Sequence, residues 1–333
     1  MEARPTPLFS VVVPVYNSQH TLTPLYERLK AVFDRELEAS FELILVDDAS
    51  ADGSWEVMQA LRQRDKAVRI VQLVNNAGQH NALMCGFSYA RGAYVITMDD
   101  DLQNPPEEIP VLYRAIQQGG LDLVVGVPEE KKHSLFRNTG TVVMNRLHEK
   151  VLNKPSHLRF GSFRIFTAEA VARMLALRTS YHYITANILR VISHRRIANV
   201  TVQHHSRTVG RSGYTLGRLV KLASNLIINH SAIPLRMGIY LGFFISALCI
   251  LYGLYIVGRI ILVGPFGVAG WATTVVLTSF LFGLLFLFLG IMGEYIYRIL
   301  NEINQPKPYQ VQHEEVAQDD TTTPGPRAPQ APV

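Results

Sequence analysis

An apolar run that passes directly into three carboxylates decides how the chain folds: Ala93-Tyr-Val-Ile-Thr-Met-Asp-Asp-Asp-Leu-Gln-Asn-Pro-Pro-Glu-Glu-Ile-Pro110. Residues Ala93–Asp99 predict a buried strand, and Pro106–Gln118 has the pattern of an amphipathic helix. Side chains two apart on an extended backbone point the same way, so Asp99 and Asp101 are expected to face one ligand together. Hard oxygen ligands at this spacing suit Mg²⁺ or Mn²⁺ held jointly with a diphosphate. The competing interpretation is a solvated acidic turn that caps the helix.

The alternation of strand and helix extends outward from this stretch over residues 9 to about 128. The other expected strands are Phe9–Tyr16, Phe41–Asp47, Val68–Val74 and Leu121–Val127. The other expected helices are Thr21–Leu37, Ser54–Arg64 and Gln79–Ala90. Such an alternation predicts a parallel sheet with helices on both faces, and the continuous apolar strands fit a sheet that is buried on both sides. Ligands of these sheets bind beyond the carboxyl ends of the strands.

The residues that directly follow the strands are therefore the candidates for binding. Tyr16-Asn17 follows the first strand, and Asp47-Asp48 follows the second, where a carboxylate can bond a base or a ribose. Gly78 comes after the third strand and would let the backbone approach a ligand closely, although a lone glycine is more often a turn. His80 has no second histidine beside it at ligand spacing, so a capping or packing role is expected for it.

Composition excludes several classes of protein. The chain has 333 residues, of which 48% are hydrophobic and 18% are charged, so it is not largely disordered. Its two cysteines, Cys85 and Cys249, form no metal or redox pattern, which excludes a disulfide framework and a cysteine-based zinc site. The net charge of +5 suits a membrane surface or a phosphate-bearing substrate, and we expect no nucleic-acid partner.

Two segments are long enough to span a membrane as helices. Gly238–Gly258 has 21 residues and Trp271–Gly293 has 23, all uncharged, whereas a bilayer core needs about 20. Basic residues flank the outer ends of this hairpin, so the positive-inside rule places both termini and the N-terminal domain in the cytoplasm. The expected organisation is a catalytic domain over 1–210, an amphipathic juxtamembrane region over 211–235, two spans over 236–300 and a disordered tail over 301–333. This describes a multi-pass protein of the inner membrane, whose hairpin could also pack with copies of itself.

A basic loop lies between the N-terminal domain and the first span. Arg207 and Arg211 precede Ser212-Gly213-Tyr214, and the guanidinium fork matches the geometry of phosphate. The alternative is the ordinary basic flank of a membrane protein.

Together these motifs resemble the inverting family-2 glycosyltransferases of GT-A fold. The similarity is carried by Pro14-Val-Tyr-Asn17, Val46-Asp-Asp-Ala-Ser50, Gly78-Gln-His-Asn-Ala-Leu83 and Asp99–Pro110. The run Asp101–Pro110, Phe136-Arg137, Pro234-Leu-Arg236 and Gly293-Glu-Tyr-Ile-Tyr-Arg298 is similar to the polyprenyl-phosphate group of that family. This group includes dolichol-phosphate mannose synthases, bactoprenol glucosyltransferases and undecaprenyl-phosphate formamido-arabinose transferases.

The resemblance implies an α/β, Rossmann-like GT-A domain followed by amphipathic interface helices and a two-helix transmembrane hairpin. It also implies transfer of a sugar from a nucleotide-diphosphate sugar to undecaprenyl phosphate with inversion, giving a lipid-phosphate sugar for modification of the cell envelope. Asp99, Asp101 and Gln103 match the motif for Mg²⁺ or Mn²⁺ and the diphosphate. The implied catalytic residues are Asp99, Asp101, Arg137 and Arg207. The implied nucleotide site comprises Pro14, Tyr16, Asn17, Asp47, Asp48, Gly78 and Asp100, and the acceptor phosphate site comprises Arg207, Arg211 and Ser212.

Three positions depart from the pattern of the family. Ser18 replaces a common Glu after Tyr-Asn, and Gly213 replaces a Lys in the acceptor loop. Ser162 stands before Phe163-Arg164, where many members have an Asp that has been proposed as a base. A phosphate monoester has a second pKa of about 6, so near neutral pH the acceptor is already largely a dianion and needs positioning more than deprotonation.

Two other functions compete with this one. A processive polysaccharide synthase would carry a Gln-x-x-Arg-Trp motif, but the only tryptophans, Trp55 and Trp271, lie in no such motif. A non-catalytic membrane scaffold on a degenerate transferase domain is the alternative of a different class. Asp99, Asp101 and Gln103 argue against the scaffold, whereas Ser162 and Gly213 favour it slightly.

Overall fold

The computed structural model describes residues 6–128, 154–177, 179, 182–205, 270–304 and 309–315, together with residue 149 and single positions between 240 and 262. The chain divides into two compact units. One unit comprises residues 1–138, 154–212 and 307–333, and the other comprises residues 139–153 and 213–306.

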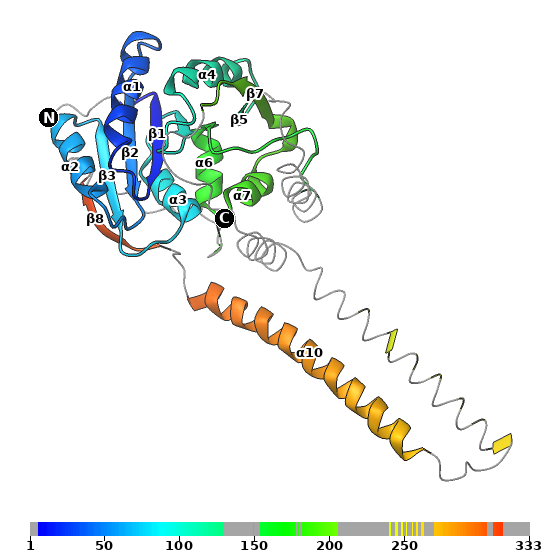
Figure 1. Cartoon of the computed structure of the whole chain (residues 1–333). Coiled ribbons are helices and arrows are strands. Elements are labelled where there is room, and N and C mark those ends of the chain that lie inside the picture. Colours follow the sequence, from blue (N-terminus) through cyan, green and yellow to red (C-terminus); the bar gives the residue numbers. More distant parts are fainter. Residues whose placement is uncertain are drawn as a thin grey trace, which may run out of the picture. The chain divides into compact units, whose positions relative to one another are not determined.

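The first unit is built on one eight-stranded sheet with the strand order β7-β5-β6-β4-β1-β2-β3-β8 (Figure 1). Its strands are β1 (Phe9–Val15), β2 (Phe41–Asp47), β3 (Val68–Leu73), β4 (Tyr94–Thr97), β5 (Leu123–Pro128), β6 (Arg164–Thr167), β7 (Ile197–Val202) and β8 (Val311–Glu315). Strands β3, β2, β1 and β4 are neighbours and run parallel, as the alternating sequence pattern predicts.

The expectation of an all-parallel sheet is wrong at two strands. β6 lies between β4 and β5 and is antiparallel to both, and β8 is antiparallel to β3. The sequence of β6, Arg-Ile-Phe-Thr, has only four residues. Neither segment is among the strands expected from the sequence. The five expected strands share one direction, and β6 and β8 are the additions that make the sheet mixed.

Helices cover both faces of the sheet. They are α1 (Leu22–Arg35), α2 (Ser54–Arg64), α3 (Gln79–Tyr89), η1 (Pro106–Glu108), α4 (Ile109–Gln117), α6 (Ala168–Leu175), α7 (Ile184–Val191) and η2 (His194–Arg196). On β1, Val11 and Val13 belong to one buried cluster with α1, α2 and α4, whereas Val12 belongs to a second cluster with α3, α6 and α7. Successive side chains of a strand point to opposite faces, so each face of the sheet has its own core. This confirms the expected doubly covered sheet.

The C-terminal segment contributes the last strand, so the prediction of a disordered tail from residue 301 is wrong for Val311–Glu315. Strand β8 pairs with β3, and the Val74 amide donates to the Gln310 carbonyl oxygen at 2.9 Å. Tyr309 and Val311 pack against the core cluster that contains α3. The polar composition of the tail does not predict this strand, because two apolar side chains are enough to dock a short segment on the edge of a sheet.

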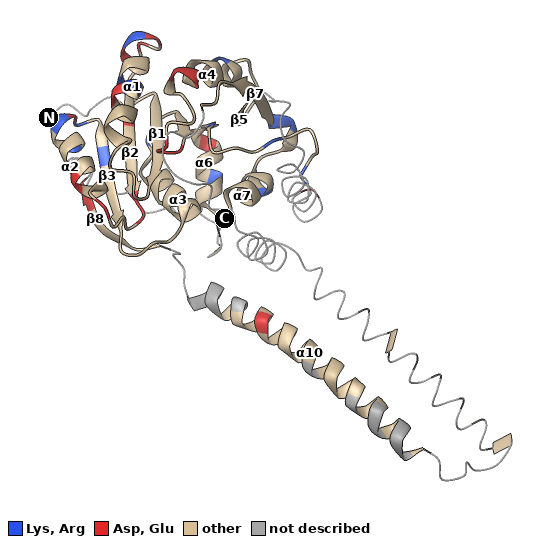
Figure 2. Ribbon diagram, viewed as in Figure 1, with Lys and Arg blue, Asp and Glu red and all other residues tan. Residues whose placement is uncertain are grey.

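The second unit contains α10 (Trp271–Asn304), which has 34 residues. Within it, Phe280–Tyr297 is long and apolar enough to cross a membrane, and none of the described side chains in that window is buried. Among the described side chains of α10, Glu294 is the one acidic residue. The described part of the helix is mostly tan in Figure 2, the colour of residues other than Lys, Arg, Asp and Glu. The expected second span, Trp271–Gly293, lies inside α10. The first span and the amphipathic region lie outside the described residues apart from single positions.

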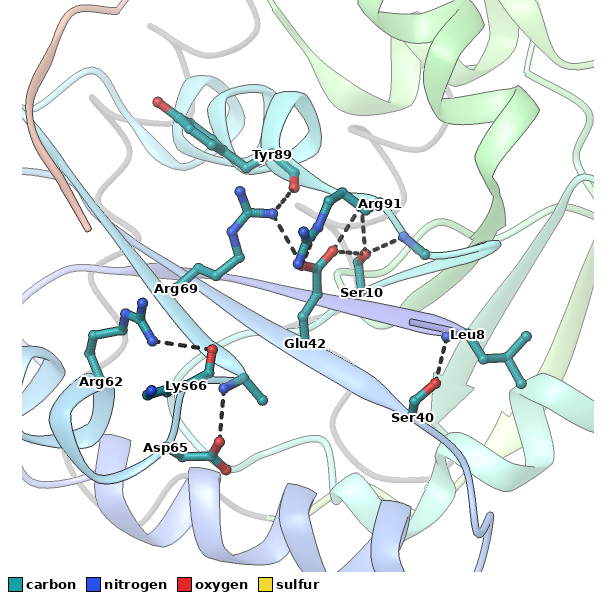
Figure 3. A network of polar contacts seen from close by, with 12 residues as sticks. Leu8, Ser10, Ser40, Glu42, Arg62, Asp65, Lys66, Arg69, Tyr89 and Arg91 are labelled. Atoms are coloured by element: carbon teal, nitrogen blue, oxygen red, sulfur yellow. Dashed lines mark hydrogen bonds and ion pairs between the residues drawn. The ribbon is translucent and has the colours of Figure 1, made fainter. Parts of the chain in front are cut away.

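A buried carboxylate joins the amino ends of the strands, opposite the end where ligands are expected (Figure 3). Glu42 on β2 is 2% exposed and accepts hydrogen bonds from the Ser10 hydroxyl at 2.6 Å and the Arg91 amide at 2.8 Å. The guanidinium groups of Arg69 and Arg91 reach its other oxygen at 3.1 and 3.0 Å. Arg69 also donates to the Tyr89 carbonyl oxygen at 2.6 Å, so the cluster ties β1, β2 and β3 to the end of α3.

We expect Glu42→Gln to destabilise the first unit by about 3 kcal/mol, because it leaves buried guanidinium charge without its partner. The measurement is the free energy of unfolding of the purified protein in denaturant. Glu27→Gln is the matched control, since Glu27 pairs with Arg64 at 2.5 Å on the surface and such a pair contributes under about 1 kcal/mol. Equal losses in the two variants would contradict the structural role of Glu42.

Candidate active site

The candidate site lies where β1, β2 and β4 end side by side at Val15, Asp47 and Thr97. Parallel strands deliver their carboxyl ends to one edge, so the loops that follow them meet there. Most of the residues predicted from the sequence to bind a nucleotide and a metal are on these loops.

The acidic motif is a turn and not the end of a strand. Strand β4 stops at Thr97, and Asp100 and Asp101 lie in a turn that brings Leu102 to a φ of 59°. The expectation that an extended backbone aligns Asp99 with Asp101 is therefore wrong. The two carboxylates are nevertheless close enough that the charge of Asp101 raises the pKa of Asp99.

Two side chains from distant parts of the sequence hold Asp99. The Ser162 hydroxyl donates to its Oδ2 at 2.5 Å, and the Gln79 amide donates to its Oδ1 at 2.6 Å. Burial raises the pKa of Asp99, the hydrogen bond from Ser162 opposes that rise, and the positive charge of Arg164 opposes it further. The carboxylate is thus surrounded by donors but keeps an uncompensated tendency to bind a proton or a cation.

Asp100, the middle carboxylate, faces the loop after β1. Its Oδ2 accepts from the Tyr16 amide at 3.3 Å, and the Ser18 hydroxyl also donates to it. Burial raises the pKa of Asp100 to about 6 against these hydrogen bonds, and the charges of Asp99 and Asp101 add to the rise. Ser18, the first departure from the family pattern, therefore contacts the acidic turn directly.

Asp101 and Gln103 are linked through the backbone. The Gln103 amide donates to Asp101 Oδ1 at 3.1 Å, and the Gln103 carbonyl accepts from the His205 amide at 2.9 Å. His205 is the last described residue before the basic loop. The chain that leads to Arg207 therefore leaves from the acidic turn. Arg207 itself, Arg211, Ser212 and Arg137 lie outside the described residues.

Asp47 and Asp48 are buried and shape the neighbouring loops. Asp48 accepts from the amides of Ala77 and Gly78 at 2.6 and 2.9 Å, and burial raises its pKa. Asp47 accepts from the Ser50 amide at 3.1 Å and the Gln72 side chain at 3.0 Å. Both carboxylates are thus engaged within the protein, and their direct contact with a nucleotide stays a prediction.

Gly78 connects the Asp48 loop to helix α3. Its φ of 86° is in the left-handed region that favours glycine, and a Cβ there would meet nothing within 4 Å. The structure therefore requires glycine at this position for its backbone conformation. Open space beside the residue is compatible with the predicted approach of a ligand.

The loop after β1 presents an aromatic ring. Tyr16 is 53% exposed, next to Asn17, which has a φ of 54°. The Asn17 side chain accepts from the Ala51 amide at 2.8 Å, which joins the loop after β1 to the loop after β2. Pro14 is buried inside β1 and positions the strand that leads to Tyr16.

Comparisons with known proteins decide the family. The glycosyl transferase family 2 profile matches residues 10–175. The undecaprenyl-phosphate 4-deoxy-4-formamido-L-arabinose transferases of Yersinia pestis and Yersinia pseudotuberculosis are 35% identical to the chain over 307 residues, which is 91% of the chain and 92% of each relative. The chain belongs to glycosyltransferase family 2.

Solved structures agree on the fold of this glycosyltransferase. Glucosyl-3-phosphoglycerate synthase from Mycobacterium tuberculosis, in complex with Mn²⁺ and uridine-diphosphate-glucose, superposes with a TM-score of 0.51 at 18% identity. The match covers 67% of this chain and 77% of that one, and the complex of the same enzyme with uridine diphosphate superposes equally well. At this identity the likeness supports the GT-A fold alone.

Nothing in the sequence alone pairs Gln79 or Ser162 with Asp99. Ser162 stands out only as a departure from the family pattern, and Gln79 only as the residue after Gly78.

Among the described residues of this glycosyltransferase, no three His, Cys, Asp or Glu side chains converge on one point. The predicted metal set, Asp99, Asp101 and Gln103, has two such residues and an amide, so substrate oxygens would have to complete it.

His80 of this glycosyltransferase is partly buried, and the loss of stability in acid tests its environment. Its ring meets Tyr183 edge-on at 4.9 Å, and its Nδ1 has no hydrogen-bond partner among the described residues. Burial, with the charges of Arg164 and His182, lowers the pKa of His80 to about 4. The unfolded chain therefore binds more protons than the folded one between about pH 6.5 and 4, and the free energy of unfolding falls as the pH falls through this window.

We expect this one group to remove about 3 kcal/mol of stability between pH 7 and 4. In His80→Gln the thermal midpoint in detergent should fall less steeply with acid than in the native protein. The carboxylates are the same in both proteins, so their contributions cancel in the comparison. His20→Gln, at an exposed position, should keep the native slope. An unchanged slope in His80→Gln would count against a neutral His80 in the folded protein.

Proposed function

We propose that this glycosyltransferase moves a sugar from a nucleotide-diphosphate sugar to undecaprenyl phosphate, with inversion at the anomeric carbon. The observation that carries this proposal is the 35% identity to undecaprenyl-phosphate sugar transferases over 91% of the chain and 92% of the relatives. The similarity extends beyond the residues matched by the family profile, 10–175, into the C-terminal half. The product would be a polyprenyl-phosphate sugar used in the cell envelope.

The acidic turn fits a divalent ion. Asp99 and Asp100 both have raised pKa values, and the neighbouring carboxylates contribute to each rise, so a cation would relieve the repulsion. Asp99, Asp101 and the Gln103 side chain would hold Mg²⁺ or Mn²⁺, which prefer such oxygen ligands. When bound, the ion neutralises charge on the donor diphosphate and on the leaving group. The related fold in M. tuberculosis was solved with Mn²⁺ and uridine-diphosphate-glucose.

The loops after β1 and β2 would bind the nucleotide. The exposed ring of Tyr16 offers a face on which a base can stack. Asn17 joins the two loops by accepting from the Ala51 amide, and Asp47 holds the loop after β2 by accepting from the Ser50 amide. Asp48 accepts from the Gly78 amide and so shapes the start of α3 beside them. Asp100 ties the acidic turn to the same loop through the Tyr16 amide. Pro14 would act through the strand that carries Tyr16.

The acceptor phosphate would lie near Arg207, Arg211 and Ser212, with Arg137 facing phosphate as well. The contact between the amide of His205 and Gln103 supports this, because it starts the basic loop at the acidic turn. A phosphate dianion needs no general base, so a serine at position 162 is compatible with transfer. The protein would contribute positioning and electrostatic complementarity, which together account for much of the rate enhancement in such reactions.

The membrane hairpin would bring the lipid acceptor to the site. Helix α10 is about 51 Å long at 1.5 Å per residue, so it can span a hydrocarbon core of about 30 Å and extend beyond it. We propose that α10 is the second of two spans, that the catalytic domain and both termini are cytoplasmic, and that the protein is in the inner membrane. Residues 211–235 would then lie at the interface.

Two alternatives are less well supported. A non-catalytic scaffold does not require a carboxylate turn held by donors from several loops, such as Gln79 and Ser162. A processive polysaccharide synthase would not be expected to share 91% of this chain's length with a lipid-phosphate sugar transferase.

A donor screen tests the function. Purified protein is mixed with undecaprenyl phosphate, Mn²⁺ and a panel of nucleotide sugars, and release of free nucleotide diphosphate is measured. We expect lipid-dependent release from one donor, lost with a chelator and lowered about 100-fold in Asp101→Asn, which removes a metal ligand. Asp34→Asn is the matched control, because Asp34 lies on α1 in a surface pair with Lys30.

Each outcome of the screen discriminates between functions. Release without lipid would mean a different acceptor. Full activity in Asp101→Asn would remove that residue from the metal site. Folded protein that turns over no donor in a broad panel would favour the scaffold.

A further inference from the structure

Both oxygens of the Asp99 carboxylate are held by side chains that come from different elements. The Ser162 hydroxyl donates to Oδ2 at 2.5 Å, and the Gln79 amide nitrogen donates to Oδ1 at 2.6 Å. Gln79 precedes Asp99 by 20 residues in the sequence, and Ser162 follows it by 63. Because each oxygen has two lone pairs, both oxygens can still bind a cation while they accept these bonds.

Each donor is attached to a rigid part of the first unit. The carbonyl oxygen of Ser162 accepts a hydrogen bond from the Thr97 hydroxyl at 2.8 Å, and the next residue, Phe163, is buried in the core. Gln79 is the first residue of α3, and the loop that precedes it is fixed because Asp48 accepts from the Gly78 amide at 2.9 Å. The backbone of each donor is therefore tied to the sheet or to the start of α3.

The position of Asp99 makes such support necessary. It follows β4 by two residues and lies in the non-repetitive segment before the turn, where the backbone does not fix the orientation of its side chain. Its charge is close to that of Asp101 and is partly offset by the buried Arg164. Groups that hydrogen-bond a metal ligand set its orientation, and their loss typically costs about 10–100-fold in metal affinity or activity.

We propose that Ser162 and Gln79 are positioning residues that orient the Asp99 carboxylate for the divalent ion, an inference that rests on the metal-dependent function proposed above. Ser162 then has a task that differs from that of a base, since its proton is committed to Asp99. A neutral hydroxyl also fits this place, because a carboxylate within hydrogen-bond distance of Asp99 would add another negative charge to the turn.

Binding of Mn²⁺ alone to the full-length protein in detergent tests the inference, with free Mn²⁺ measured by its EPR signal. We expect Ser162→Ala and Gln79→Ala each to raise the Kd for Mn²⁺ about 10-fold. Ser162→Thr keeps the hydroxyl and should restore affinity to within about twofold of the native value. Ser88→Ala is the matched control, because the Ser88 hydroxyl donates to the Cys85 carbonyl oxygen within α3, away from the carboxylates.

The outcomes separate this inference from the function on which it rests. Native affinity in both alanine variants overturns the positioning role and leaves the metal site intact. A loss in Ser162→Thr equal to that in Ser162→Ala means that packing and not the hydroxyl matters, which also overturns it. Native protein that binds no Mn²⁺ either alone or with a nucleoside diphosphate added, which supplies the substrate oxygens, removes the metal-dependent mechanism and this inference together. Thermal midpoints are recorded for every variant, and if Ser162→Ala fails to fold, the exposed Gln79 carries the test alone.

Discussion

Three successive carboxylates in the segment that follows β4 impose the constraint on which the rest of the catalytic unit depends. Their mutual repulsion has to be reduced without removing the charge that binds a cation. The donors come from separate loops: the Tyr16 amide, the Ser18 hydroxyl, the Gln79 amide and the Ser162 hydroxyl. A sheet buried on both faces brings these loops together, because neighbouring parallel strands end at the same edge. The fold is thus the means of assembling donors around one acidic turn.

Buried negative charge is balanced differently at the two ends of the sheet. At the amino ends, Glu42 is neutralised by two guanidinium groups and two further donors, so the cluster is complete without a ligand. At the carboxyl ends, neutral donors surround the acidic turn, and the buried Arg164 offsets part of the charge of Asp99. The first arrangement stabilises the fold, whereas the second leaves charge available for binding.

The sequence predicted the elements near the site well and the contacts between them poorly. Strands β1, β2 and β3 and helices α1, α2 and α3 lie within two residues of their predicted bounds, because long apolar periods define them. Strand β6, with four residues, and β8, in a polar tail, have no such period. The pairing of Ser162 with Asp99 joins residues 63 apart, and the positive φ of Leu102 belongs to a residue type that rarely adopts it. Local sequence patterns predict neither a contact between distant residues nor an unusual backbone angle.

Strand β8 has a consequence for how the protein is made. The register pairs Leu73 with Val311, so the partner of β3 lies 238 residues later in the chain (311 − 73). Synthesis proceeds from the N-terminus, and α10 therefore emerges from the ribosome before the catalytic sheet has its last strand. The sheet is completed only after the apolar helix has been translated. Chains released before residue 311 would expose the edge of β3 to other strands, so protection of this edge depends on a segment translated after the long apolar helix α10.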